Sequence, residues 1–301
     1  MSPIGRRGPL LMLAFDHRSS FAREVTGSDE VAGPEAERVE AMKLMVYEGL
    51  AAAADRFAPG ELGLLVDEQY GSHVVPLARE RGITVAVPVE RSGRDVFEFE
   101  YGDAFMDHIR ALDPDMAKVL VRLNPDGSAA DNELQLAHLR RLADALRDSG
   151  YGFLFELLVP PTAAQLEACG GEKLAFELEM RAGLILRAMA TIQEAGIEPD
   201  VWKVEGVEEE GDAGAIVALA RSEPRWFEVA CTVLGAGAGD DRVERWLRVA
   251  ASAGFSGFAI GRSIWREPVR AHLAGELDRE AAIAAVRDRF EHFAAVFGAA
   301  A

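Results

Sequence analysis

The sequence predicts an α/β protein that forms one (β/α)8 TIM barrel, and two observations predict that fold. Eight short apolar runs alternate with stretches of helical periodicity from residue 10 to residue 262, which is the order expected of parallel strands covered by helices. No GxGxxG motif follows the first run to open a helix, so the alternative, a doubly wound open sheet, is less favoured. We therefore expect a single domain over residues 1–301.

The expected strands are the eight apolar runs themselves. In a parallel barrel both faces of a strand are buried, so its sequence is apolar nearly throughout. The runs cover residues 10–16, 62–68, 83–90, 117–123, 152–159, 200–206, 227–235 and 256–262. A charged residue inside one of these runs is therefore unusual and indicates a site.

The expected helices lie between these runs and have recognisable ends. Pro34 suits the first position of a helix over residues 34–57. Gly150 stands where a residue in the left-handed conformation would end a helix, and Asp131 and Asp240 are candidate N-caps.

The composition limits the classes of partner. A net charge of −18 without any run of Lys or Arg excludes nucleic acid and anionic membrane surfaces, whereas a small anionic substrate is compatible if cations gather in its pocket. No stretch approaches the roughly 18 apolar residues of a membrane span. Cys169 and Cys231 form no CxxC pair, which favours a reducing cytoplasm. The sequence leaves the oligomeric state open, and a homo-oligomer is compatible with it.

Three of the expected strands carry charged side chains that face into the barrel. Side chains alternate along a strand, and Trp202 suits the outer face toward the helices, so Lys203 points inward. The same alternation turns Glu156 inward on the fifth run and gives Lys118 and Arg122 one parity on the fourth run. The C-terminal ends of barrel strands carry the catalytic groups of such enzymes, so these charges indicate an active site.

Lysine is scarce in this chain, which adds weight to two of these positions. The sequence holds four lysines, and two of them, Lys118 and Lys203, lie inside expected strands. The structural alternative is that Lys203 reaches the rim or pairs with Glu205 as a structural ion pair. Three inward charges on adjacent strands favour the functional interpretation.

The chemistry that suits these residues is the cleavage of a carbon–carbon bond through a Schiff base. A lysine amine attacks a carbonyl only when it is unprotonated, so its pKa must fall below about 10.4, and burial or a neighbouring cation lowers it. Lys203 is the candidate nucleophile, Lys118 is the neighbouring cation, and Glu156 is the general acid and base for the proton transfers. This scheme needs no metal and no cofactor.

A phosphate site is expected where the seventh and eighth strands end. Gly235 and Gly237 lie between the seventh strand and the next helix, where backbone N–H groups bind phosphate at a helix N-terminus. Arg262, at the end of the eighth strand, adds a bidentate cation. The alternative is that the glycines form only a turn.

Further substrate contacts are expected from charged residues at or near strand ends, namely Asp16, Arg18, Arg122 and Glu205. Residues 88–102 form a long acidic and aromatic loop after the third strand. We expect this loop to cover the barrel mouth, and a loop that closes over the substrate is the alternative.

Five segments carry a resemblance to a known family: "LAFDHRSSF", "AKVLVRLNPDG", "FLFELLVPPT", "PDVWKVEG" and "GFAIGRSIW". They resemble the domain that many bacteria carry fused behind 5-dehydro-2-deoxygluconokinase. That domain is in turn similar to the metal-independent tagatose 1,6-bisphosphate aldolases. The resemblance spans nearly the whole chain, in order.

The resemblance implies a class I aldolase acting on a small sugar phosphate. It implies that the Schiff base forms at Lys203, that Glu156 is the acid and base with Lys118 nearby, and that Gly261 and Arg262 contact phosphate. It also implies the cleavage of 2-deoxy-5-keto-gluconate 6-phosphate to dihydroxyacetone phosphate and malonate semialdehyde in inositol catabolism. Tagatose 1,6-bisphosphate or another sugar phosphate is the alternative substrate.

Two functions of other kinds stay open. Metal-assisted cleavage would use Asp16, Glu68 and a histidine, but the six histidines show no HxH or HExxH spacing, so no metal site is expected. The other is a barrel that binds sugar phosphates without turning them over.

Overall fold

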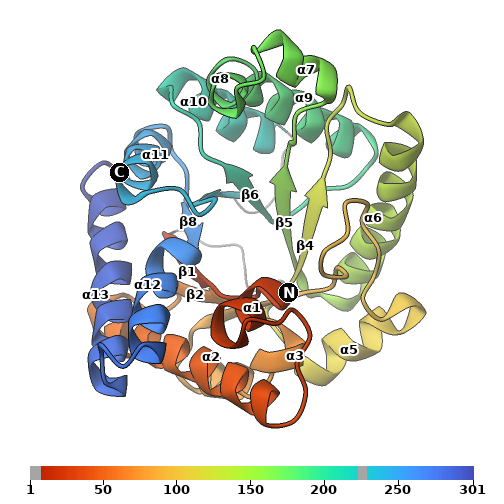
Figure 1. Cartoon of the computed structure of the whole chain (residues 1–301). Coiled ribbons are helices and arrows are strands. Elements are labelled where there is room, and N and C mark those ends of the chain that lie inside the picture. The colour runs from red at the N-terminus through yellow and green to blue at the C-terminus, as the bar shows by residue number, and fades with distance from the viewer. Residues whose placement is uncertain (1–7, 223–228) are drawn as a thin grey trace.

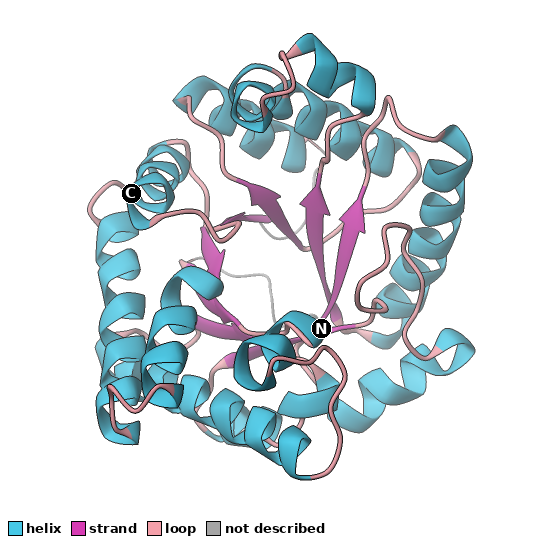
Figure 2. Cartoon of the chain, in the orientation of Figure 1, coloured by secondary structure: helices cyan, strands magenta, loops and turns pink. Residues whose placement is uncertain are grey.

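The structure, a computed structural model, describes residues 8–222 and 229–301, in which eight parallel strands close into a barrel. The strands are hydrogen-bonded in chain order, and β1 (Leu10–Ala14) pairs with β8 (Gly257–Ile260) to complete the ring. Figures 1 and 2 show the strands at the centre with the helices around them. The predicted (β/α)8 barrel is confirmed, and the open-sheet alternative is wrong.

The observed strands overlap the eight expected runs, and all but the fourth are shorter, mostly at their polar C-terminal ends. The other strands are β2 (Leu62–Leu65), β3 (Thr84–Pro88), β4 (Met116–Arg122), β5 (Gly152–Leu158), β6 (Val201–Glu205) and β7 (Ala230–Leu234). Residues 227 and 228 of the seventh expected run lie outside the described residues.

The helices fill the connections between consecutive strands and extend beyond β8. They are α1 (Ser19–Thr26), α2 (Pro34–Ala53), α3 (Glu68–Gly71), α4 (Val74–Glu80), α5 (Phe105–Leu112), α6 (Ala129–Ser149), α7 (Ala163–Ala168), α8 (Lys173–Glu179), α9 (Arg181–Glu194), α10 (Glu210–Ala220), α11 (Asp240–Ser252), α12 (Arg262–Leu273) and α13 (Arg279–Gly298), with short 3-10 helices η1 (Ala54–Arg56) and η2 (Gly102–Ala104). None of the helices in the described ranges combines the length and hydropathy that a membrane crossing needs.

The apolar core has two layers, which the alternation of side chains along the strands produces. Phe155 and Trp202 belong to the large outer layer between strands and helices. Leu154 and Val201, their sequence neighbours, belong to the small inner layer within the barrel. This observed parity agrees with the one predicted for β5 and β6, and it turns Glu156 and Lys203 toward the barrel axis.

The C-terminal helix completes the outer ring by packing on β8 and on α2. The rings of Phe290 in α13 and Phe258 in β8 have centroids 5.7 Å apart. Figure 1 shows α13 beside α2. The two helices approach closely at Gly49, where a Cβ would lie 2.5 Å from Cγ1 of Val286. A larger residue at Gly49 would therefore push these helices apart.

Two of the predicted helix ends are confirmed and two are wrong. Pro34 begins α2, and Gly150 ends α6 in the left-handed conformation with φ 80°. The N-cap of α6 is Ser128, whose hydroxyl accepts from the backbone N–H of Asp131 at 3.3 Å. Asp131 and Asp240 instead lie in the first turns of α6 and α11, where their charge favours the helix dipole.

Candidate active site

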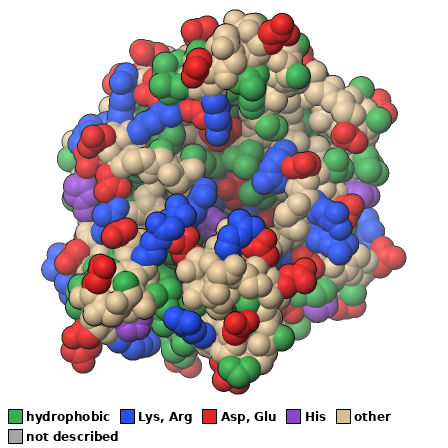
Figure 3. All heavy atoms as spheres, viewed as in Figure 1, with side chains coloured by type: hydrophobic (Ala, Val, Ile, Leu, Met, Phe, Trp, Pro, Cys, Tyr) green, Lys and Arg blue, Asp and Glu red, His purple; other side chains and the backbone are tan. Residues whose placement is uncertain are grey.

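A pocket of about 290 Å³ opens at the C-terminal ends of the strands, between α1 and the loop after β3. Five arginines and two lysines line it against three acidic side chains, although the whole chain has a net charge of −18. Figure 3 shows Lys and Arg side chains gathered around the hollow on this face. Cations are thus concentrated where an anionic substrate needs them.

Lys203 and Glu156 face each other inside this pocket. β5 and β6 pair in a register that sets Glu156 beside Lys203 with the same inward parity. Nζ of Lys203 lies 2.9 Å from Oε1 of Glu156, and the exposed fractions of the two residues are 4% and 7%. The predicted nucleophile and the predicted acid and base are therefore in direct contact and largely shielded from water.

Lys118 lies on the other side of Glu156 and is surrounded by carboxyl groups. Its Nζ is 2.9 Å from Asp16, 2.7 Å from Glu90 and 3.0 Å from Glu156. Burial lowers the pKa of Lys118, but the charges of Asp16, Glu156 and Glu90 outweigh burial and hold that pKa well above its ordinary value. Lys118 is thus a cation neutralised by its own partners. We expected Lys118 to be a neighbouring cation that lowers the pKa of Lys203. In the structure, three carboxyl groups offset its charge.

The three carboxyl groups around Lys118 differ in their affinity for a proton. Burial raises the pKa of Glu156, but Lys118 and Lys203 outweigh burial and bring that pKa below its ordinary value. The pKa of Asp16 is depressed against burial by the same two lysines. Burial dominates at Glu90 and raises its pKa. Asp16 and Glu156 are therefore ionised, and of the three, Glu90 holds a proton most readily.

Three of the four predicted substrate contacts line the pocket: Asp16, Arg18 and Arg122. Arg18 donates to the backbone oxygen of Glu90 and forms an ion pair with Glu100 at 2.8 Å. Nη1 of Arg122 donates to the backbone oxygen of Arg94 at 2.9 Å. These arginines connect β1 and β4 to the loop after β3.

The loop after β3 covers one side of the barrel mouth. Glu90 and Phe99 form an isolated antiparallel bridge, which folds the loop back on itself. Phe97 and Phe99 are buried with ring centroids 4.9 Å apart. Ser92 and Gly93, which lie between the bridged residues Glu90 and Phe99, line the pocket.

Glu205, the fourth predicted substrate contact, does not lie among the residues that line the pocket. Its Oε2 accepts from the backbone N–H of Val159 at 2.9 Å, and its Oε1 lies 3.8 Å from Arg181. Glu205 is the last residue of β6 and pairs in register with Leu234 of β7, and the partners of its carboxylate lie beyond the end of β5 and on α9. This carboxylate connects the ends of β5 and β6 to α9, and a contact of Glu205 with a substrate stays a prediction.

The glycine loop after β7 and the start of α12 come together, as the phosphate prediction requires. Gly261 is the N-cap of α12, and Nη2 of Arg262 donates to the backbone oxygen of Ala236 at 3.2 Å. Added Cβ atoms would lie 2.9 Å from Cζ of Arg262 at Gly237, 2.2 Å from a backbone oxygen at Gly261 and 3.3 Å from side chains at Gly235. The close approach needs glycine at Gly237 and Gly261, and phosphate binding here stays a prediction.

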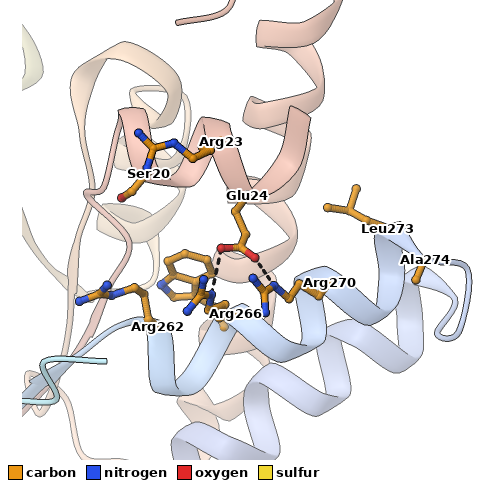
Figure 4. Close-up of a pocket in the computed structure, with 9 residues that line it drawn as sticks. Ser20, Arg23, Glu24, Arg262, Arg266, Arg270, Leu273 and Ala274 are labelled. Atoms are coloured by element: carbon orange, nitrogen blue, oxygen red, sulfur yellow. Dashed lines mark hydrogen bonds and ion pairs between the residues drawn. The ribbon is translucent and has the colours of Figure 1, made fainter. Parts of the chain in front are cut away.

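Arg262 opens onto a second cleft of about 650 Å³ between α1 and α12. Figure 4 shows Arg266 and Arg270 turned toward Glu24, whereas Arg262 points away from that carboxylate. Arg23 lines both this cleft and the pocket that holds Lys203. The predicted phosphate region is therefore adjacent to the candidate active site.

Comparison with known proteins places the chain in a family. The family model described as "Uncharacterized protein conserved in bacteria (DUF2090)" matches residues 5–300. The chain belongs to this family. No curated protein matches the sequence.

Solved structures of similar shape are known. A fructose-bisphosphate aldolase from Plasmodium falciparum, in a complex with TRAP and a small-molecule inhibitor, is 13% identical with a TM-score of 0.68, covering 97% of this chain and 91% of that one. A Schiff-base-forming fructose-1,6-bisphosphate aldolase is 14% identical with a TM-score of 0.58, covering 96% and 95%. At these identities the likeness shows that the DUF2090 chain shares their fold.

Two buried charged residues near the pocket were not among the predicted site residues. Glu90 is the last residue of the third apolar run, as Asp16 is of the first. This position is the sequence feature that could have indicated Glu90 as a site residue. Lys43 of α2 is completely buried and donates to the backbone oxygens of Phe15 at 2.6 Å and His17 at 2.9 Å. It also pairs with Asp67. Through these hydrogen bonds, Lys43 fixes the backbone of the segment after β1.

The residues of the metal-assisted alternative are not brought together. Over residues 8–222 and 229–301, His, Cys, Asp and Glu side chains form no group of three or more that could hold a metal ion. Glu68 lies 2.8 Å from His108, whereas Asp16 pairs with Lys118.

Proposed function

We propose that this DUF2090 protein is a class I aldolase that cleaves a phosphorylated keto sugar or keto sugar acid through a Schiff base on Lys203. The observation that carries this proposal is the contact of 2.9 Å between the buried amine of Lys203 and Glu156 in a pocket that five arginines and two lysines line. The shared fold with a Schiff-base-forming aldolase supports it. The sequence resemblance to class I aldolases supports it independently.

The first half of the reaction builds the Schiff base. Lys203 transfers a proton to Glu156, and the free amine then attacks the keto carbon of the substrate. The resulting carbinolamine loses its hydroxyl as water, with Glu156 returning the proton to the leaving oxygen. The product is an iminium ion joined to Lys203, and Glu156 is again a carboxylate ready to act as a base.

The second half breaks the carbon–carbon bond. Glu156 removes the proton from the hydroxyl on the carbon beyond the breaking bond, and that carbon leaves as an aldehyde. The bonding electrons move into the iminium ion and form an enamine. Protonation of the enamine carbon and addition of water then release the ketone product and restore Lys203.

Lys118 and Asp16 prepare this chemistry without forming covalent bonds. Lys118 keeps Glu156 oriented and lowers its pKa, which favours the carboxylate form that acts as a base. Asp16 fixes Lys118 from the end of β1 at 2.9 Å. A fixed arrangement of donors and acceptors reduces the reorganisation needed during the reaction.

We propose 2-deoxy-5-keto-gluconate 6-phosphate as the substrate, cleaved to dihydroxyacetone phosphate and malonate semialdehyde. It carries an anion at each end, which suits a pocket rich in arginine. Arg262 with the glycine loop after β7 would hold the phosphate, and Arg18 and Arg122 lie on the other side of the pocket. Tagatose 1,6-bisphosphate and other keto sugar phosphates are the alternative substrates.

The decisive experiment traps the Schiff base. Incubation with dihydroxyacetone phosphate and borohydride should give a stable mass adduct on Lys203 in wild type and in Lys173→Met, whose lysine is exposed on α8. An adduct elsewhere, or none, would contradict the proposal. A panel of keto sugar phosphates, assayed for release of a triose phosphate, then identifies the substrate, and stabilisation by these ligands without any product would instead indicate a binding protein.

A further inference from the structure

Glu90 lies in the candidate active site, and only one of its two carboxyl oxygens has a hydrogen-bond partner among the described residues. Its Oε1 accepts from Lys118 at 2.7 Å, and its backbone oxygen accepts from Arg18. Its Oε2 is buried and has no hydrogen-bond partner among the described residues. Glu90 is 9% exposed and lines the pocket. Neither the formation of the Schiff base nor the cleavage step, as proposed, needs this residue.

A buried carboxyl oxygen without a partner is unfavourable, and such atoms in a pocket are commonly satisfied by a ligand. The charges around Lys118 also single out Glu90. Asp16 and Glu156 are ionised and match the charges of Lys118 and Lys203, whereas burial raises the pKa of Glu90. A protonated Glu90 leaves an O–H donor in the pocket.

The position of Glu90 indicates which part of the substrate it meets. Glu90, Lys118, Glu156 and Lys203 form a chain with successive separations of 2.7, 3.0 and 2.9 Å. The keto carbon is bound at Lys203, at one end of this chain. With the phosphate of the ketone half at Arg262, as proposed, the half of the substrate beyond the breaking bond would extend away from Arg262 toward the other end of the chain of side chains, where Glu90 lies.

We propose that Glu90 binds the half of the substrate that leaves as the aldehyde, with Oε2–H donating a hydrogen bond to an oxygen of that half. This inference rests on the proposed aldolase function and adds a specificity residue to it. A carboxylate or hydroxyl oxygen on the leaving half accepts such a bond, whereas an ionised Glu90 would repel a carboxylate. The charged groups that face Glu90 are Lys118 from β4, Asp16 after β1 and Arg18 before α1.

Two variants test this role on the sugar phosphate that the panel identifies, starting with 2-deoxy-5-keto-gluconate 6-phosphate. Glu90→Gln keeps an N–H donor at every pH, and Glu90→Ala removes the donor. In wild type, KM should rise as the pH increases through the raised pKa of Glu90 and this residue loses its proton. In Glu90→Gln, KM should stay constant over that range. In Glu90→Ala, KM should be about five- to tenfold higher than in wild type at pH values below that pKa, with kcat changed less.

The control separates this inference from the proposed function. Trapping with dihydroxyacetone phosphate and borohydride needs only the ketone half, so both Glu90 variants and Glu133→Gln, an exposed carboxylate on α6, should trap as wild type does. Failure of wild type to trap overturns the aldolase proposal and this inference with it. Normal trapping together with the wild-type pH dependence of KM in Glu90→Gln overturns this inference alone, as does a lowered melting temperature with unchanged KM. If Glu90→Ala does not fold, Glu90→Gln decides the question.

Discussion

Lys43 and Lys203 are both buried lysines, yet their surroundings differ. The ammonium group of Lys43 has three donors and uses them on Asp67 and two backbone oxygens. In the described part of the chain, Lys203 has Glu156 as its one carboxylate within ion-pair distance. Lys43 is completely enclosed, whereas Lys203 lines the pocket. A lysine with all donors used supports the fold, and a lysine with spare donors at a pocket is available to a substrate.

The contrast extends to what each lysine leaves behind when it is removed. Without Lys203, Glu156 still pairs with Lys118 at 3.0 Å. Without Lys43, Asp67 keeps only its hydrogen bond from the backbone N–H of Tyr70 among the contacts described, and its buried charge has no cation. Activity and stability should therefore depend on different lysines, and that separation can be tested.

The largest expected effect is the loss of activity in Lys203→Met. Without its nucleophile, cleavage should fall by about 10⁴-fold or more, and the borohydride adduct should be absent. The melting temperature should change little, because Glu156 keeps Lys118. Triose phosphate release and circular dichroism measure both properties, with Lys173→Met as the matched control. Retained cleavage in Lys203→Met would remove this lysine from the mechanism.

Glu156→Gln should have the next largest effect. The amide keeps the size of the side chain but cannot carry protons, so kcat should fall by about 10²–10⁴-fold. Steady-state kinetics on the cleaved substrate measure this change. Glu205→Gln is the comparison, because Glu205 lies at the C-terminal end of β6 and is not among the residues that line the pocket. An equal loss of kcat in both variants would point to general damage instead of proton transfer.

Lys43→Met should reduce stability while leaving the chemistry intact. Removal of one partner of a buried ion pair typically costs about 3–5 kcal/mol of unfolding free energy, because the remaining charge stays buried. Denaturant unfolding measures this loss, and the trapping yield per folded molecule should stay near that of wild type. The double variant Lys43→Met, Asp67→Asn should recover part of the stability. Unchanged stability in the single variant would mean that the two buried lysines do not differ as argued.

These two lysines also show which parts of the site can be predicted from the sequence. The inward position of Lys203 and Glu156 follows from strand alternation and from the pairing of consecutive strands, both of which are local rules. Glu205 shares the parity of Lys203, but its carboxylate accepts from Val159 and lies 3.8 Å from Arg181, and strand alternation does not indicate either partner. Lys118 was placed correctly, but its partners Asp16 and Glu90 come from segments after β1 and β3. Their convergence depends on barrel closure.

Lys43 was beyond prediction for a related reason. Its position on a helix tells which face it shares, but not that this face lies under the segment after β1. Its three acceptors come from residues 24 to 28 positions away, and two of them are backbone oxygens, which leave no mark in the sequence.

The smallest expected effect concerns the pH dependence of stability at Glu156. Because its pKa is lower in the folded protein than its ordinary value, its ionised form stabilises the fold above about pH 4, and this stabilisation is lost as pH falls through the lowered pKa. The unfolding free energy of wild type should therefore exceed that of Glu156→Gln at neutral pH, and the difference should shrink as pH decreases below about 4. Denaturant unfolding at a series of pH values measures it. If the difference in unfolding free energy did not depend on pH, Lys118 and Lys203 would not stabilise the carboxylate of Glu156. The ion pair with Glu156, which distinguishes Lys203 from Lys43, would then have no energetic consequence.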